Sequence, residues 1–149
     1  MRILGLLLSL MAALALTAVA AEPASPDVFA NAGFKITLPS NATAAIQRGP
    51  DFDVYYVTWG TTGHLGLYEG CCPQTFLAGP DVQTNDITIN GLKAKELKRS
   101  DGTALSRELH ITIARPGTTY TMIVHTWYKS LSADDAAIAD RILATITAK

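Results

Sequence analysis

The chain carries little excess charge of either sign, and this scarcity excludes one class of partner. Its 149 residues have a formal net charge of −1, and removal of Arg2 with the leader described below would lower this to −2. A protein that binds the phosphates of a nucleic acid needs a basic surface. The basic residues between 93 and 99 alternate along a predicted strand, which is more typical of a solvated face than of a polyanion site. We therefore expect no nucleic-acid partner.

Long apolar runs are also scarce, and the one that exists lies at the start of the chain. Met1 and Arg2 precede an apolar stretch that reaches Leu16, and small residues follow up to Ala20. This order is typical of an export leader. The run is shorter than the roughly 20 apolar residues that span a membrane, and no second run follows. We predict a secretory signal peptide over 1–20, a location in the periplasm or outside the cell, and no stable membrane anchor.

Internal repeats and low-complexity blocks are absent, so the remaining residues are expected to form one domain. Their number is sufficient to bury a core without metals or disulfides. Residues 21–32 contain two prolines and are predicted to be a flexible lead-in. We expect a single α+β domain over 33–149.

Short β-type runs divided by turn residues, followed by one helix, predict the fold. Residues 34–38 alternate apolar and polar and stop at Pro39, whereas 52–59 and 64–69 have the composition of a hairpin. We expect an antiparallel meander of about six to seven strands flanked by a C-terminal helix. Asn90-Gly91 is compatible either with a type I′ turn or with a bend inside one long strand.

Two later turns predict which side chains face each other. A two-residue turn at 101–102 places Glu96 opposite Arg107. It also places Lys95 opposite Glu108, so both pairs are complementary in charge.

A turn over 115–118 extends this pairing to a third strand. It places Ile113 opposite Tyr120 and Ile111 opposite Met122. The two turns together predict strands over 92–99, 103–114 and 119–128, with a core face made of Leu92, Ala94, Leu109, Ile111, Ile113, Tyr120, Met122 and Val124.

The last segment has the signals of a helix. Ser132 is a suitable N-cap and is followed by two aspartates that favour the positive helix end. Ile138, Ile142 and Ile146 then recur at helical spacing, which predicts an apolar stripe packed on the sheet.

Three short motifs resemble those of PsbP-like domains. They are Gly33-Phe34-Lys35-Ile36-Thr37-Leu38-Pro39, Ile89-Asn90-Gly91 and Ile142-Leu143-Ala144-Thr145-Ile146, and the resemblance spans nearly all of 33–147. It implies an α/β/α sandwich with an antiparallel sheet, no catalytic residue, and a non-enzymatic accessory or binding role in a larger assembly.

The only two cysteines are adjacent, at Cys71 and Cys72, which is unusual in an exported chain. Neighbouring Cα atoms lie about 3.8 Å apart, below the usual disulfide range, so a bond between them would be strained. Three interpretations stay open: a strained disulfide, two thiols of which one is buried, or ligands to Cu(I) or Zn with His64 as a third donor.

A second candidate cluster follows from the predicted registers. They place Lys95, Glu108 and His125 in one row opposite the apolar face, with His110 diagonally beside them. A carboxylate beside two histidines can perform acid–base chemistry or hold a metal, although such rows also stabilise solvated sheet faces. Ile123 and Trp127 share this face, so a covering segment would turn the row into a buried network.

Several catalytic motifs are missing, namely a Gly-rich phosphate loop, a G-x-S-x-G elbow and an H-E-x-x-H pair. We therefore expect that the protein is not an enzyme and has no cofactor. We expect an exported binding or accessory protein whose partner is another protein or a small molecule. One alternative is a soft-metal or redox protein that uses Cys71 and Cys72. Another is an inhibitor or immunity protein of the cell envelope, since 117–120 resembles the Gly-x-x-Tyr loop of secreted lysozyme inhibitors, although a turn followed by a strand needs the same residues.

Overall fold

The computed structural model describes residues 26–114, 117 and 119–149. The leader predicted over 1–20 lies outside the described residues, as do 21–25 of the lead-in and three residues of the turn predicted over 115–118. None of the helices in the described part of the chain is long and apolar enough to cross a membrane.

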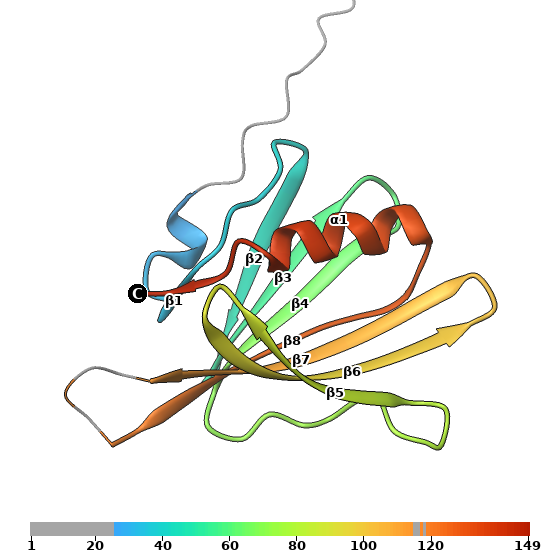
Figure 1. Ribbon diagram of the computed structural model, residues 1–149. Coiled ribbons are helices and arrows are strands. Elements are labelled where there is room, and N and C mark those ends of the chain that lie inside the picture. Colours follow the sequence, from blue (N-terminus) through green and yellow to red (C-terminus); the bar gives the residue numbers. More distant parts are fainter. Residues whose placement is uncertain (1–25, 115–116, 118) are drawn as a thin grey trace, which may run out of the picture.

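A seven-stranded antiparallel sheet forms the centre of the domain, with one helix lying across it (Figure 1). A 3-10 helix, η1 (Pro26–Phe29), precedes it, and a two-stranded sheet joins β1 (Phe34–Lys35) to β9 (Thr147–Ala148). This is an α+β fold, as the sequence pattern predicts. The strands of the large sheet, in spatial order, are β2 (Ala42–Arg48), β3 (Asp53–Trp59), β4 (Gly63–Gly70), β8 (Thr121–Leu131), β7 (Ala104–Ala114), β6 (Leu92–Asp101) and β5 (Gln83–Ile89).

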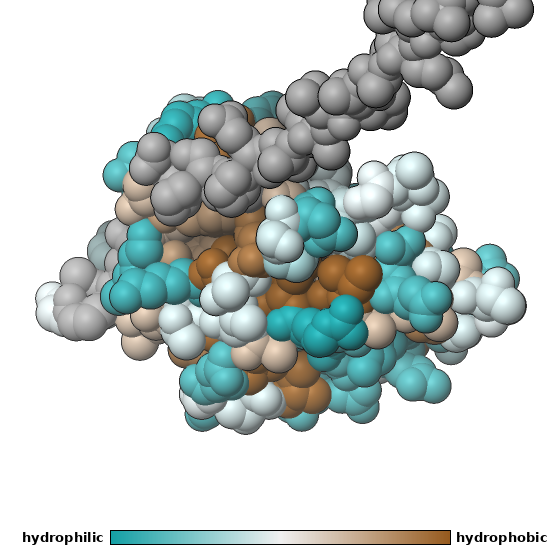
Figure 2. Space-filling model, turned by 90° about the horizontal axis from the view of Figure 1, so that it is seen from above, coloured by the Kyte–Doolittle hydropathy of each residue, from teal (hydrophilic) through white to brown (hydrophobic). Residues whose placement is uncertain are grey.

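One face of the sheet packs against α1 (Ala133–Leu143). Ser132 caps this helix as predicted, because its hydroxyl accepts a hydrogen bond from the amide of Asp135 at 3.2 Å. Ile142 is buried and Ile138 is partly buried against the core, whereas Ile146 is buried just beyond the end of the helix. The side of the molecule that carries α1 shows apolar residues gathered in the middle and polar residues around them (Figure 2).

The other face of the sheet is crossed by the chain between β4 and β5. Three strands, β8, β7 and β6, separate β4 from β5 in the sheet. Residues 71–82, which we call the crossing segment, therefore run beneath these strands on the side opposite α1 (Figure 1). Leu77 is the buried residue of this segment. A face that the local sequence pattern leaves open to solvent is thus partly covered.

Both predicted registers in the meander are wrong by two residues. Strand β6 continues to Asp101, which pairs with Ala104, so Gly102 takes the first position of the turn with φ 58°. A type II′ turn places glycine at this position. Likewise, Ala114 pairs with Thr121. The meander itself and most of its predicted core face are confirmed, but Tyr120 precedes β8 and is 80% exposed.

Asn90 and Gly91 form the tight turn of a β-hairpin between β5 and β6, and not a bend inside one long strand. Asn90 and Gly91 both have positive φ, 48° and 78°, as a type I′ turn requires. The side-chain amide of Asn90 also donates hydrogen bonds to the backbone carbonyls of Ala144 and Ile146, at 2.6 and 3.0 Å. The turn thereby satisfies backbone acceptors that the end of α1 leaves free.

The lead-in is packed on the domain from residue 28 onward. Phe29 stacks on Tyr55 with ring centroids 4.9 Å apart, and Ala32 is buried. The expectation of a flexible segment up to residue 32 is therefore wrong for this part, because the aromatic contact holds it in place.

A charge network lies at the side of the sheet next to α1. Arg107 donates to Glu96 at 2.7 Å and to Asp140 of α1 at 2.7 Å, and Tyr128 also donates to Asp140. Glu96 is 4% exposed. Burial alone would raise the pKa of Glu96, but Lys98 and Arg107 outweigh it and lower that pKa. The predicted Glu96–Arg107 pair thus forms, although the two residues are diagonal rather than opposite.

We predict that Glu96→Gln lowers the free energy of unfolding at pH 7 by about 1–3 kcal/mol. Folding favours the ionised form of Glu96, so its contribution is present above the usual glutamate pKa of 4.5 and is lost as the pH falls below it. Urea unfolding at pH 7, 5 and 3 measures the difference from the wild type, which should shrink at the lowest pH. Asp81→Asn, which removes an exposed pair at 3.9 Å, is the control and should change little. A difference that stays constant with pH contradicts this account.

Candidate metal centre

Three potential metal ligands come together on the face beneath the crossing segment. Glu108 and His110 are two residues apart on β7, so their side chains leave the same face of the sheet. His125 on β8 lies directly opposite His110. The two imidazole rings stack with their centroids 4.5 Å apart. We call Glu108, His110 and His125 the trio.

The trio is buried to an extent that is unusual for titratable side chains. The side chains of Glu108 and His125 are 0% and 1% exposed, and that of His110 is 19% exposed. Side chains of this kind are seldom buried without partners. Within the described part of the chain, however, Glu108 Oε2, His110 Nε2 and His125 Nε2 are buried and have no hydrogen-bond partner. Each of these atoms is a good donor atom for a metal.

The distances between the unpaired oxygen of Glu108 and the two imidazole nitrogens show whether hydrogen bonds or a shared ion can link them. Glu108 Oε2 lies 3.9 Å from His110 Nε2 and 3.8 Å from His125 Nε2. Hydrogen bonds between such atoms are at most about 3.2 Å long, so these contacts are not hydrogen bonds. Ligands about 2.0–2.1 Å from a tetrahedral zinc ion lie about 3.3 Å from one another. The carboxylate oxygen would therefore have to approach each imidazole nitrogen by about half an ångström to reach this spacing, and the three ligand atoms all lie within 4.8 Å of one another.

The other oxygen of Glu108 is held by the crossing segment. Oε1 accepts hydrogen bonds from the backbone amides of Phe76 and Leu77, at 2.6 and 2.7 Å. Burial alone would raise the pKa of Glu108, but the two imidazoles and the Phe76 amide lower it to about 2. The carboxylate is thus ionised at neutral pH, with one oxygen anchored and the other directed toward the histidines.

Two aromatic rings, those of Phe76 and Trp127, pack beside His125. The ring of Phe76 lies 5.2 Å from His125 and 5.1 Å from Trp127, and Trp127 lies 5.1 Å from His125. Gly66 on β4 lies opposite Trp127, and a Cβ there would come within 2.3 Å of the indole ring. Glycine at this position therefore leaves the space that the indole occupies. Phe76 is itself 42% exposed, so these rings cover His125 while Phe76 stays in contact with solvent.

Two imidazoles and one carboxylate form a ligand set that is typical of transition metals. Imidazole suits zinc, copper, iron and nickel, and a His₂Glu set occurs in catalytic zinc sites. Among the described residues, the trio is the group of three ligand-bearing side chains whose donor atoms come within 4.8 Å of one another. With three protein ligands, a tetrahedral ion keeps its fourth position open.

The structure brings together three of the four residues of the predicted polar cluster, namely Glu108, His110 and His125. Lys95 lies opposite His110, but it is exposed and forms no ion pair with Glu108, which lies opposite Leu97. The expected Lys95–Glu108 pair is therefore wrong, because the register differs by two residues. The sequence left open whether this face is covered; the crossing segment covers it, and Glu108 and His125 are buried. The hydrogen bonds from the backbone amides of Phe76 and Leu77 to Glu108 could not be predicted, because no local sequence pattern marks them.

The second predicted site, at the cysteines, is not assembled. His64 begins β4 and the cysteines follow its end, so about seven residues of strand, or about 23 Å, separate them. His64 is exposed and its Nδ1 contacts the carbonyl of Thr62. The expectation of a metal site made of Cys71, Cys72 and His64 is therefore wrong.

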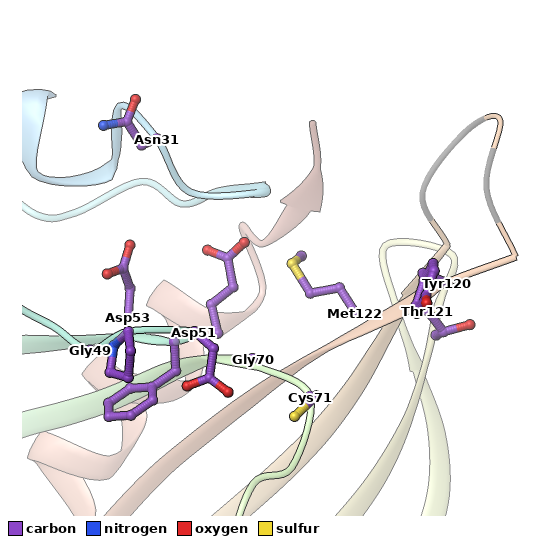
Figure 3. A pocket seen from close by; sticks show the side chains of 12 residues that line it. Asn31, Gly49, Asp51, Asp53, Gly70, Cys71, Tyr120, Thr121 and Met122 are labelled. Carbon is purple, nitrogen blue, oxygen red and sulfur yellow. The ribbon is translucent and has the colours of Figure 1, made fainter.

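The two thiols are free, and both are exposed. Neither a strained disulfide nor a buried thiol is present. The hydrogen bond and charge of Cys71 raise the pKa of Cys72, which disfavours its thiolate, the form that binds metals. Cys71 borders a pocket of about 470 Å³, together with Asp51, Asp53 and Met122 (Figure 3).

No protein-family model matches the chain, and no curated protein matches it either.

We predict that Glu108 holds the crossing segment in place. In metal-free protein, Glu108→Ala should speed hydrogen exchange at the amides of Phe76 and Leu77 by about tenfold or more, because hydrogen bonds to a charged acceptor are lost. Glu108→Gln keeps an acceptor oxygen and should stay closer to the wild type. Protection of Ile111 reports whether the sheet is intact. If the two amides exchange equally fast in the wild type and in Glu108→Ala, the segment is held by other contacts.

Proposed function

We propose that the protein binds one divalent transition-metal ion, of the zinc class, at Glu108, His110 and His125. A single observation carries this proposal: three buried ligand atoms without hydrogen-bond partners lie within 4.8 Å of one another, with the Glu108 oxygen 3.8 and 3.9 Å from the two imidazole nitrogens. A bound cation would satisfy all three atoms at once. This differs from the soft-metal alternative at the cysteines, because imidazole and carboxylate prefer a borderline ion to Cu(I).

The anchoring of Glu108 supports the same proposal. Ligating carboxylates in metal sites are commonly held by a second set of hydrogen bonds, which orient the coordinating oxygen. Glu108 has this arrangement, since Phe76 and Leu77 hold Oε1 and leave Oε2 toward the histidines. The Glu108 carboxylate is therefore already oriented toward the histidines without a bound ion.

Export to the periplasm and a non-enzymatic binding role remain predictions from the sequence. The PsbP-like α/β/α sandwich is likewise a proposal; the antiparallel sheet with α1 across one face supports one of its helical layers, whereas the segment over residues 71–82, on the other face, contains no helix. A metal centre is compatible with such a binding role. It provides no support for the inhibitor alternative, in which an envelope hydrolase would be the partner.

We predict that the protein binds one equivalent of zinc and that His110→Ala weakens this binding by about 100-fold or more, since even the loss of a group that only hydrogen-bonds to a metal ligand costs about 10- to 100-fold. Competition with a chromophoric chelator measures the affinity. His64→Ala is the matched control, because His64 is exposed and distant from the trio. Circular dichroism verifies that each variant is folded.

A double variant, Cys71→Ser with Cys72→Ser, separates this site from the thiols. Zinc binding should survive in it. The proposal is overturned if the double variant loses binding, if His110→Ala binds as tightly as His64→Ala, or if the wild type binds no zinc.

A further inference from the structure

The crossing segment covers only part of the sheet face that lies opposite α1. Its Phe76 packs beside the rings of β8 and donates to Glu108 of β7. At the other end of the sheet, on β2, β3 and β4, most side chains of this face stay open to solvent. The exposed ones are Thr43, Ala45, Gln47, Tyr56, Thr58 and His64. We call these six residues, together with Gly66 of β4 and Trp127 of β8, the open face.

The open face carries almost no ionic groups. Over β2, β3 and β4, all of which the structure describes, none of its side chains is aspartate, glutamate, lysine or arginine. The charged residues of these strands, Arg48, Asp53 and Glu69, alternate onto the face toward α1. Lys129 at the border places its Nζ over the ring of Phe76, 4.6 Å from the centroid. Since exposed positions are where charged residues are common, a surface without them matches an uncharged partner.

Aromatic rings gather on this face. One cross-strand row over β2, β3, β4 and β8 contains, in register, Ala45, Tyr56, Gly66 and Trp127. Tyr56 has small residues on both sides, and it is 45% exposed. Phe76 is 42% exposed and contacts Trp127. Single exposed apolar residues are ordinary, but a group of them on one face marks a binding surface.

The indole of Trp127 lies flat on β4. A Cβ at Gly66 would come within 2.3 Å of Cε2 and Cζ2 and within 2.9 Å of Cδ2 of this indole. Cδ2 and Cε2 are the two atoms that both rings of the indole share, so the face of the indole, and not its edge, lies over the Gly66 backbone. Trp127 is still partly exposed. Tyr56 on β3 pairs with Gly66, so the two rings lie on either side of this glycine.

Neutral hydrogen-bonding groups surround the rings. The hydroxyls of Thr43 and Thr58 lie 2.9 Å apart and share one hydrogen bond, and each can make others, because a hydroxyl has one donor and two acceptor positions. Gln47 and His64 are also exposed. An uncharged sugar chain offers the matching groups, because its C–H bonds pack against the electron-rich face of an aromatic ring while its hydroxyls form hydrogen bonds.

We propose that the open face binds an uncharged polysaccharide, whose sugar rings stack on Tyr56 and Trp127 and whose hydroxyls bond to Thr58 and His64. The row from β2 to β8 extends over three strand spacings, or about 14 Å, so it suits an extended chain better than a single sugar. This inference is independent of the metal centre, since none of the trio lies on β2, β3 or β4.

Nuclear magnetic resonance of the ¹⁵N-labelled protein tests this inference with three neutral probes of equal length, cellohexaose, maltohexaose and chitohexaose. We expect at least one of them to shift the amide signals of Tyr56 and Gly66 in a saturable way, with or without a metal chelator present. Hexagalacturonate, which carries a carboxylate on each sugar, should bind more weakly, because the open face offers it no cationic partner.

Tyr56→Ala should weaken the binding of the neutral probe by about fivefold or more, because one stacking ring is lost. Tyr56→Phe keeps the ring and should bind like the wild type. Tyr120→Ala is the matched control, since Tyr120 is 80% exposed and lies outside the open face. The inference is overturned if none of the three neutral probes binds, if hexagalacturonate binds as tightly, or if Tyr56→Ala behaves like Tyr120→Ala. It is also overturned if sedimentation shows a dimer that Tyr56→Ala converts to a monomer, because the open face would then be a contact between two copies.

Discussion

One carboxylate, that of Glu108, connects the sheet to the segment that covers it. Its Oε1 accepts two hydrogen bonds, from the backbone amides of Phe76 and Leu77, and its Oε2 is directed toward two imidazoles. The anchor exists because β4 and β5 are separated by three strands, so the chain between them has to cross the sheet. Without this crossing, the trio would lie on a solvated face, where water would satisfy each polar atom. The strand order is thus the cause of the burial, and the burial is the cause of the unpaired donor atoms.

Magnitudes indicate why this arrangement favours a cation. A buried polar atom without a partner costs about 1–3 kcal/mol, and the trio contains three such atoms. The whole stability of a domain is about 5–15 kcal/mol. The three unpaired atoms of a metal-free centre therefore lower the free energy of unfolding by a large fraction of its total. A bound ion would remove this destabilisation, because it would coordinate all three atoms. The charge network at Glu96 and Arg107 provides a contrast, because each of its buried charges already has a hydrogen-bonded partner of opposite sign.

The sequence predicted the faces of the sheet better than its registers. Both hairpins are shifted by two residues, and a shift by an even number leaves every side chain on its own face. Glu108, His110 and His125 were therefore assigned to one face correctly, although the partners of Lys95 and Tyr120 were wrong. The helix and its Ser132 cap were predictable because their signals are local. The crossing segment was not, since the pairing of β4 with β8 joins residues far apart in the chain and leaves no local pattern. For the same reason, proximity in sequence wrongly placed His64 beside the cysteines.

The central claim is that the trio, and not the cysteine pair, coordinates a metal ion. X-ray absorption at the zinc edge of the protein loaded with one equivalent of zinc tests this most directly, because it identifies the ligand atoms. The account predicts nitrogen and oxygen neighbours at about 2.0–2.2 Å, with the multiple-scattering pattern of two imidazoles. Sulfur neighbours at about 2.3 Å would place the ion at Cys71 and Cys72 and contradict the account.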